Sequence, residues 1–262
     1  MASKYTLRIV LPLLIVFVSC TPIELKQVDD DVPVIEGYIS PGNLFSVLIS
    51  RQVAFADNDT NIYYIDSLDI DVLVNDEAFT LQWVDSGLYI NEQIVVEEED
   101  VVELSFEYHG KTVSASTVIP GKPENFVSSA YGIAAVDLDE YGRPEIPDPI
   151  ELNWDNDSLE YYMIVVENIE SNPTQINEDD DRPPRAFRSS PIQTNEAALN
   201  AMDFTYYGNH NVILYKLNAE YAALYEQLES SSTDISAPPS NVENGLGIFT
   251  GINADTIRVK VY

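Results

Sequence analysis

The residue with the clearest chemical role is Cys20, the only cysteine of the 262-residue chain. Lys4 and Arg8 precede an apolar run at residues 9–18, and a serine stands directly before the cysteine. A basic segment, a short apolar segment and a small residue are typical of an export signal. The apolar run is too short to cross a bilayer, because a membrane-spanning helix needs about 20 residues. We therefore expect residues 1–19 to be a signal peptide.

Cleavage before Cys20 would free its amine for acylation, while its thiol takes a diacylglycerol, as in bacterial lipoproteins. The expected product is a palmitate-type lipid anchor at Cys20, followed by a polar acylated tether at residues 20–31. The alternative is an ordinary secretory signal that contains a cysteine by chance. Acylation would leave no thiol for a disulfide or a cysteine–zinc site.

The best candidate for a metal ion is the acidic stretch that starts at Asp137. Asp137, Asp139 and Asp148 stand at the first, third and twelfth places of a calcium-loop spacing, with Gly142 at the sixth. Tyr141 at the fifth place is a poor ligand, and the pattern around the stretch predicts no flanking helices. We expect no resident metal ion, and these three aspartates are only a weak calcium candidate.

Motifs for catalysis or cofactor binding are missing from the sequence. It has no nucleophile elbow, phosphate-binding loop or dinucleotide fingerprint. His109 and His210 stand alone, without partners at metal-ligand spacing, so solvated histidines are the simpler interpretation. We expect no catalytic residue, no cofactor and no enzymatic activity.

Arg182, Arg185 and Arg188 form the one basic cluster, directly after the acidic residues 178–181. They lie in a long irregular stretch, residues 171–195, and loops of this length are usually functional or disordered. One interpretation is a solvated loop whose opposite charges neutralise each other. The other is a docking arm for a partner, with the three arginines as its contacts.

The charge of the chain excludes some partners. The formal net charge is −31, and removal of Lys4 and Arg8 leaves 11 basic against 44 acidic residues. Such a chain repels nucleic acid and anionic headgroups, so we expect no nucleic-acid partner. Attachment to a membrane must then come from lipid at Cys20, and multiple acyl chains hold a protein more firmly than one.

Residues 32–120 alternate apolar and polar residues, with a turn about every ten residues. Pairs such as Asn75-Asp76 and His109-Gly110 suit two-residue hairpin turns. About seven short antiparallel strands in this length predict a β-sandwich.

A break at residues 119–123, with two prolines around a glycine, predicts a domain boundary. Residues 124–262 are then expected to form a second β-sandwich. Residues 161–166 are apolar on both faces, which predicts a covered central strand. One helix is expected at about residues 218–230, with Asn218 as its cap. The predicted fold class is mainly β, with two immunoglobulin-like or fibronectin-III-like sandwiches.

The order of several features resembles the Bacteroidota outer-membrane lipoproteins grouped as domain-of-unknown-function family 4249. These features are Cys20, residues 34–39 (VIEGYI), residues 117–120 (TVIP), Tyr161-Tyr162, Glu220-Tyr221 and, as the most specific piece, residues 239–249 (PSNVENGLGIF). The resemblance covers essentially the whole chain. It implies a cell-surface lipoprotein, often encoded beside a TonB-dependent receptor, whose first domain, residues 32–120, is immunoglobulin-like or carboxypeptidase-regulatory-like. The resemblance carries no catalytic residues.

The expected function is that of a non-catalytic outer-membrane lipoprotein, surface-exposed, which assists a TonB-dependent receptor or captures a nutrient ligand for it. One alternative is a carbohydrate-binding or glycan-processing module, with Trp154, Tyr206 and Tyr207 as exposed aromatic residues. The other is a structural envelope or adhesion protein.

Overall fold

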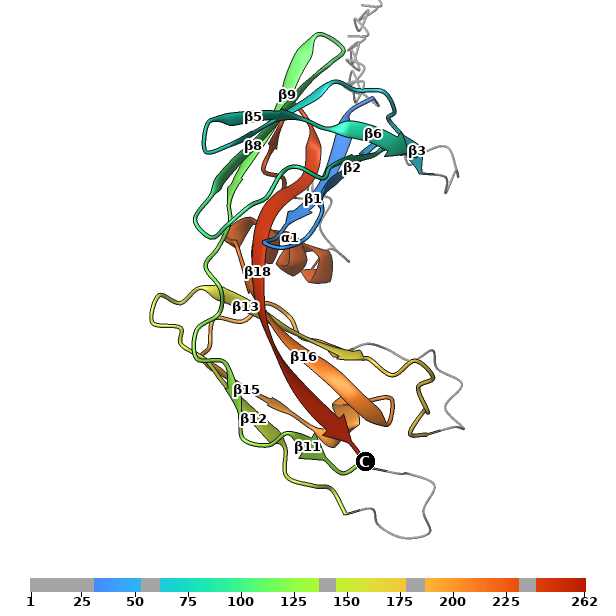
Figure 1. The fold of residues 1–262 in the computed structure, drawn as a ribbon, viewed down its shortest axis with the longest axis vertical. Coiled ribbons are helices and arrows are strands. Elements are labelled where there is room, and N and C mark those ends of the chain that lie inside the picture. The colour runs from blue at the N-terminus through green and yellow to red at the C-terminus, as the bar shows by residue number, and fades with distance from the viewer. Residues whose placement is uncertain (1–30, 53–61, 137–144, 178–186, 231–238) are drawn as a thin grey trace, which may run out of the picture.

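The computed structural model describes residues 31–52, 62–136, 145–177, 187–230 and 239–262. The chain is built almost entirely from strands and forms a curved, elongated body (Figure 1). Within the described ranges, no helix combines the length and apolar character that crossing a bilayer requires. The elements are β1 (Pro33–Ile39), β2 (Phe45–Arg51), β3 (Tyr63–Tyr64), β4 (Ile70–Val74), β5 (Glu77–Thr80), β6 (Gln82–Asp85), β7 (Leu88–Asn91), β8 (Val101–Tyr108), β9 (Lys111–Val118), β10 (Val127–Ser128), β11 (Gly132–Ile133), β12 (Ile150–Asn153), β13 (Tyr161–Asn168), β14 (Phe187–Arg188), β15 (Glu196–Leu199), the 3-10 helix η2 (Ala201–Asp203), β16 (Gly208–Leu217), α1 (Ala219–Ser230), β17 (Val242–Glu243) and β18 (Leu246–Val261).

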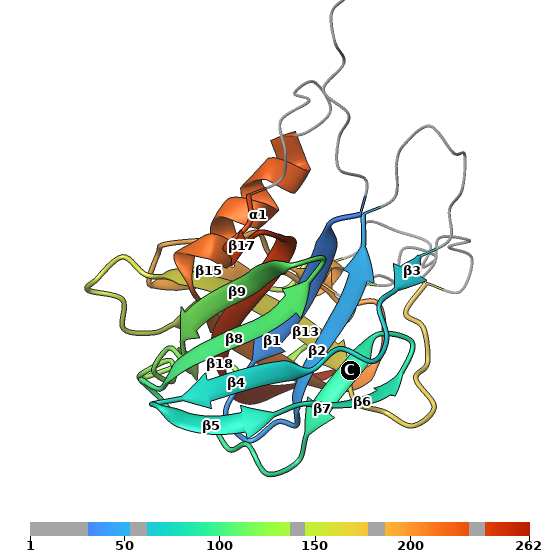
Figure 2. The same cartoon turned by 90° about the horizontal axis from the view of Figure 1, so that it is seen from above.

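The first sandwich has two layers, which are seen from above in Figure 2. One layer is the five-stranded sheet β17-β9-β8-β4-β5, and the other contains β1, β2, β7, β6 and the first part of β18. Because successive side chains of a strand point to opposite faces of the sheet, the apolar residues of each strand point inward. Together they form one continuous core between the two layers. Its fully buried members include Ile35, Ile49, Ile70, Val72, Tyr89, Val102, Val113 and Phe249.

The second sandwich packs the three-stranded sheet β10-β12-β15 against β13, β16 and the last part of β18, with β14 and β11 at the edges. Its core includes Leu152, Trp154, Ile164, Leu199, Val212 and Leu214. The prediction of a central strand covered on both faces is confirmed for β13. Tyr162, Ile164 and Val166 face this core, whereas Met163 and Val165 pack on the opposite face with residues of α1 and β16.

The predicted mainly β fold with β-sandwiches is therefore confirmed, but the path of the chain differs from the expected division at residues 120–124. Residues 242–251, which were expected in the second sandwich, return to the first. There β17 pairs with β9, and Leu246–Gly251 pairs with β1 in parallel. The remaining part of β18 pairs with β16 in the second sandwich. A single strand thus belongs to both halves, so strand alternation alone did not reveal where the C-terminal segment pairs.

The predicted two-residue turns are present. Asn75 and Asp76 have φ of 48° and 72° between β4 and β5, and His109 and Gly110 have φ of 49° and 74° between β8 and β9. Two successive positive φ values give the turn twist that matches two antiparallel strands. These turns fix the strand register of the five-stranded sheet.

The glycine-rich segment at residues 239–249 allows β18 to lie tightly against β1. Gly247 has φ of +95°, and a Cβ atom there would lie 2.1 Å from the carbonyl oxygen of Ile35. Asn241 closes the other side, because its Oδ1 accepts from the N–H of Phe249 at 3.0 Å and its Nδ2 donates to the same residue's carbonyl at 2.6 Å. The most specific motif of the sequence is therefore structural, since it inserts β17 and β18 between β9 and β1.

A methyl group at Gly247 should disrupt this pairing. We expect Gly247→Ala to lower the free energy of unfolding by more than about 2 kcal/mol, through left-handed strain together with the clash with β1. Gly110→Ala is the matched control, because Gly110 also has a positive φ of +74° but no atom within 4 Å of its Cβ position. Urea unfolding of the mature, non-acylated chain measures both, and equal losses would contradict the proposed close contact.

The junction between the sandwiches is held by a polar network around Thr117, a buried residue of β9. Its hydroxyl donates to Glu220 Oε1 at 3.3 Å and accepts from the N–H of Gly251 at 2.8 Å and from Asn218 Nδ2 at 3.0 Å. Glu220 also accepts from the hydroxyl of Thr250 at 3.0 Å. The network joins α1 to both β9 and β18, so it fixes the helix at the bend of the molecule.

Asn218 stands directly before α1, as predicted, but its side-chain amide forms hydrogen bonds with β9 at the junction between the sandwiches. Its carbonyl accepts from the N–H groups of Tyr221 and Ala222, as the first carbonyl of a helix does. Its Nδ2 donates to Thr117 and to the carbonyl of Val118 at 2.8 Å. Contact with β9, rather than helix propensity, therefore determines the position of this asparagine.

Replacing the Thr117 hydroxyl by a methyl group tests the junction. Thr117→Val keeps the shape but leaves the buried N–H of Gly251 without its acceptor, which costs about 1–3 kcal/mol. Thr80→Val is the control, because the hydroxyl of Thr80 makes an exposed 3.4 Å contact with Asp71. We expect a clear decrease in melting temperature for the first variant and almost none for the second. Equal melting temperatures would show that the network contributes no stability.

Candidate functional site

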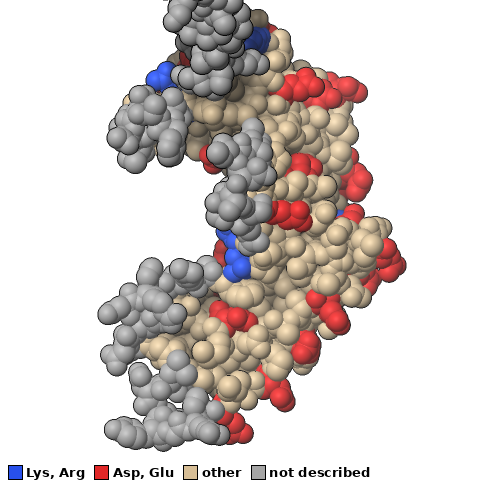
Figure 3. All heavy atoms as spheres, turned by 180° about the vertical axis from the view of Figure 1, so that it is seen from behind, with Lys and Arg blue, Asp and Glu red and all other residues tan. Residues whose placement is uncertain are grey.

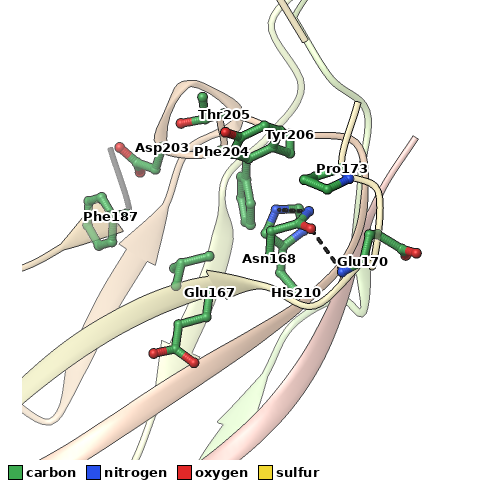
Figure 4. Close-up of a pocket in the computed structure, with 11 residues that line it drawn as sticks. Glu167, Asn168, Glu170, Pro173, Phe187, Asp203, Phe204, Thr205, Tyr206 and His210 are labelled. Carbon is green, nitrogen blue, oxygen red and sulfur yellow. Dashed lines mark hydrogen bonds between the residues drawn. The ribbon is translucent and has the colours of Figure 1, made fainter. Parts of the chain in front are cut away.

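A pocket of about 450 Å³ lies at one end of the second sandwich (Figure 4). Its walls come from the end of β13 and the loop after it, from β14, and from the segment that joins η2 to β16. The lining combines aromatic rings, carboxylates and one imidazole: Val166, Glu167, Asn168, Glu170, Pro173, Phe187, Asp203, Phe204, Thr205, Tyr206 and His210.

His210 forms the floor of the pocket and is 2% exposed. Its Nδ1 lies 3.1 Å from the carbonyl oxygen of Gly208, and its Nε2 lies 3.1 Å from Nδ2 of Asn168. Because the Gly208 oxygen only accepts, Nδ1 carries the proton, and Nε2 accepts from the amide of Asn168. Asn168 donates its other hydrogen to the carbonyl of Tyr207 at 3.0 Å. Nε2 therefore joins β16 to β13, while Nδ1 is used within β16 itself.

This environment corrects the expectation that His210 is solvated. Burial lowers the pKa of the imidazole, and the hydrogen bond to Gly208 and the charge of Glu170 oppose this effect only in part. The edge contact with the ring of Phe204, whose centroid lies 5.1 Å away, adds to the apolar surroundings. The neutral ring is therefore a structural element rather than a base or a metal ligand. His109, in contrast, is exposed in its hairpin, as expected.

Two of the carboxylates at the rim are held in place by their own hydrogen bonds. Glu170 Oε1 accepts from the backbone N–H and from Nδ2 of Asn209, both at 2.7 Å, and these bonds lower the pKa of Glu170. Asp203 Oδ2 accepts from the N–H of Asn200 at 2.7 Å, in the capping box of η2. In Figure 4 the carboxylate of Glu170 points away from His210. The pocket therefore has fixed negative charge at its rim.

The interior of the pocket is aromatic. Phe204 is buried, and Phe187 and Tyr206 are half-buried around the opening. An aromatic interior with a carboxylate rim suits a ligand that has both an apolar face and groups that donate hydrogen bonds.

The structure places only some of the residues predicted to form sites. Cys20, Asp137, Asp139, Arg182 and Arg185 lie outside the described residues. Asp148 is exposed just before β12, and the described residues contain no group of three or more potential metal ligands. Arg188 lies exposed on β14, next to the pocket-lining Phe187.

The aromatic residues named for carbohydrate binding fall in different places. Trp154 is 3% exposed and packs in the second core between Phe126 and Tyr162, which corrects its assignment as an exposed residue. Tyr206 lines the pocket, and Tyr207 is half-buried against the core. No local pattern indicated that Phe187, Phe204 and Asn168 would line a pocket, because the pocket forms only when β13, β14 and β16 meet.

The fold and the site together define a β protein of two sandwiches that share one strand and carry a binding pocket in the second. The family model described as "Domain of unknown function (DUF4249)" matches residues 21–258, and the chain belongs to this family. The predicted family is therefore confirmed. Among proteins with curated descriptions, none matches.

A solved structure of the FN1-FN3 domains of chicken CNTN1 is similar at 11% sequence identity, with a TM-score of 0.26. The match covers 87% of this chain and 66% of that chain. At this level of similarity the comparison carries no argument about function.

The burial of His210 predicts a loss of stability in acid. The pKa of His210 in the folded protein lies below the ordinary value of 6.5. At a pH between the folded pKa and 6.5, the unfolded chain therefore binds a proton that the folded chain does not. Stability from this group is complete above pH 6.5 and is lost as the pH falls through the folded pKa. We expect His210→Gln to be less stable at pH 7 but to lose less stability between pH 7 and pH 5.

Urea unfolding at a series of pH values measures this difference. His109→Gln is the control, because it removes an exposed imidazole and should leave the acid-side loss in place. An unchanged pH dependence in His210→Gln would contradict the assignment of a neutral, buried ring.

Proposed function

We propose that the protein is a non-catalytic lipoprotein of the outer membrane, anchored through Cys20, which captures a ligand for a TonB-dependent receptor. The observation that carries this proposal is the position of the pocket. Asp31, the first described residue, contacts the hairpin between β8 and β9 in the first sandwich, whereas the pocket lies in the second. A lipid at Cys20 would hold the first sandwich near the membrane and leave the pocket facing outward.

The rigid connection between the sandwiches supports the same proposal. Strand β18 runs through both, and the network of Thr117, Asn218 and Glu220 fixes the bend. A capture protein of this kind presents its pocket at a fixed distance and direction from its anchor, because the two halves share hydrogen-bonded strands rather than a linker. Membership of the family adds the expectation of a receptor partner.

A pull-down from native outer membranes tests the proposal. A tag at the exposed C-terminal Tyr262 should recover a TonB-dependent receptor, and mass spectrometry should find Cys20 acylated. Tyr206→Ala in the pocket should leave the recovery of the receptor unchanged, because the proposal assigns the pocket to the ligand and not to the receptor. Tyr131→Ala, at a 69% exposed tyrosine before β11, is the matched control. A free thiol at Cys20, or recovery of no receptor, would refute the proposal.

A glycan as the captured ligand is the second candidate. The aromatic walls at Phe187, Phe204 and Tyr206, with carboxylates at the rim, offer ring faces for stacking and acceptors for hydroxyl groups. A glycan array with the mature chain should then give signals that Tyr206→Ala abolishes and Tyr131→Ala keeps. Signals that are equal in both variants would exclude the pocket as the glycan site.

A further inference from the structure

Five large apolar side chains are exposed together on β3 and β6 and the residue before β3. Ile62 is 64% exposed, Tyr63 36%, Tyr64 40%, Trp83 45% and Val84 51%. We call these five residues the aromatic edge, because β6 is the last strand in the order of the ten-stranded sheet. Other exposed apolar residues, such as Tyr131 and Ile146, stand singly on the second sandwich and need no explanation.

Short contacts hold two members of the aromatic edge, Tyr64 and Trp83, around one turn. Tyr64 pairs with Ser50 of β2, and the indole N–H of Trp83 donates to Asp66 Oδ1 at 3.1 Å. The same oxygen accepts from the N–H of Gly87 at 2.7 Å, and the side chain of Tyr64 packs directly over Gly87. Trp83 and Tyr64 therefore flank one fixed hydrogen-bonded turn.

The aromatic edge lies at the end of the molecule where the tether begins. The guanidinium of Arg51 stacks over the ring of Tyr63 at 4.7 Å, and its Nη1 lies 3.9 Å from Asp31 Oδ1. Tyr108 donates to Asp31 at 2.7 Å, a bond that is the largest cause of the lowered pKa of Asp31. Figure 1 shows β3 and β6 at the same end as the start of β1.

The length of the tether limits how far this end can stand from a membrane. Ten residues lie between Cys20 and Asp31, and a fully extended chain from one to the other spans at most about 40 Å. The end of the molecule that carries the aromatic edge is therefore the end that an acylated Cys20 keeps beside the bilayer.

Charged side chains of both signs lie at this end. Arg51 and Lys111 stand beside the hairpin of His109 that contacts Asp31, and Asp66 accepts from the indole of Trp83. Figure 3 shows basic and acidic side chains near the uppermost grey atoms, and acidic side chains along the convex margin. Basic groups are therefore present at this end, although the chain as a whole is strongly acidic.

We propose that the aromatic edge lies in the headgroup region of the bilayer in which Cys20 is anchored, and so sets the orientation of the protein. Tryptophan and tyrosine suit this region, because each has an apolar body and a polar tip. The lipid supplies attachment and the aromatic edge supplies direction, which leaves the pocket of the second sandwich facing outward. This inference rests on the lipid anchor of the proposed function.

The two tryptophans of the chain make a direct test, because Trp83 is exposed and Trp154 is buried in the second sandwich. The full-length mature, acylated protein is reconstituted into phosphatidylcholine vesicles with or without brominated acyl chains, which quench nearby indoles. We expect a loss of emission with the brominated lipid in the wild type and in Tyr131→Ser. We expect no loss in Trp83→Phe, and a smaller loss in Tyr63→Ser and Tyr64→Ser.

Flotation of the vesicles separates the two ways in which the test can fail. Protein that does not float with the vesicles overturns both the anchor and this inference. Protein that floats but shows equal emission in the two lipids overturns the inference alone. Shielding of Trp83 from acrylamide in native membranes, without quenching in vesicles, would show that a protein partner covers the aromatic edge and would also overturn it.

Discussion

The close parallel pairing of β1 with the first part of β18 is the contact on which the rest of the molecule depends. At Gly247 the backbone of β18 contacts the backbone of β1 directly. At Gly37 the ring of Phe249 packs against the backbone, and a Cβ atom there would lie 2.7 Å from the ring. With this pair in place, β18 completes the sheet of the first sandwich and continues into the second. The pocket and the aromatic edge are consequently fixed in one frame.

Polar contacts stabilise the bend between the sandwiches, beside an apolar cluster in which Tyr221 of α1 packs with Met163 and Val165. Thr117, Asn218 and Glu220 connect three elements, while Asn253 donates to the carbonyl of Pro120 at 3.0 Å and Lys122 pairs with Asp255 at 2.9 Å. Hydrogen bonds specify direction more strictly than apolar contacts do, because they weaken when the angle changes. The junction therefore defines the angle between the halves as well as joining them.

The local structure could be predicted from the sequence because it depends on neighbouring residues. Alternation along β8 and β9, the positive φ at Asn75 and Gly110, and the two apolar faces of β13 all follow from short-range patterns. The family could also be recognised from the order of its motifs. A glycine inside a strand usually marks a close approach of another backbone, as Gly247 does beside β1.

The long-range features could not be predicted in the same way. Val34 pairs with Leu246, and no short-range pattern in the sequence indicates that these two distant residues are neighbours. Residues 242–251 were therefore predicted to lie in the wrong sandwich. The same reason applies to His210 and Trp154, whose burial is decided by strands distant in sequence. The pocket is the clearest case, because Phe187, Phe204 and Asn168 become neighbours only after the sheets have formed.

The shared strand also has a consequence for how the chain reaches its native state. The second strand of the pair, residues 246–251, is synthesised long after β1, yet the first sandwich needs it to complete a sheet. Contacts between such distant positions carry a large loop-closure cost and slow the search for the native topology. The N-terminal half therefore stays incomplete until the C-terminal residues arrive, and maturation of the two halves becomes a single cooperative event.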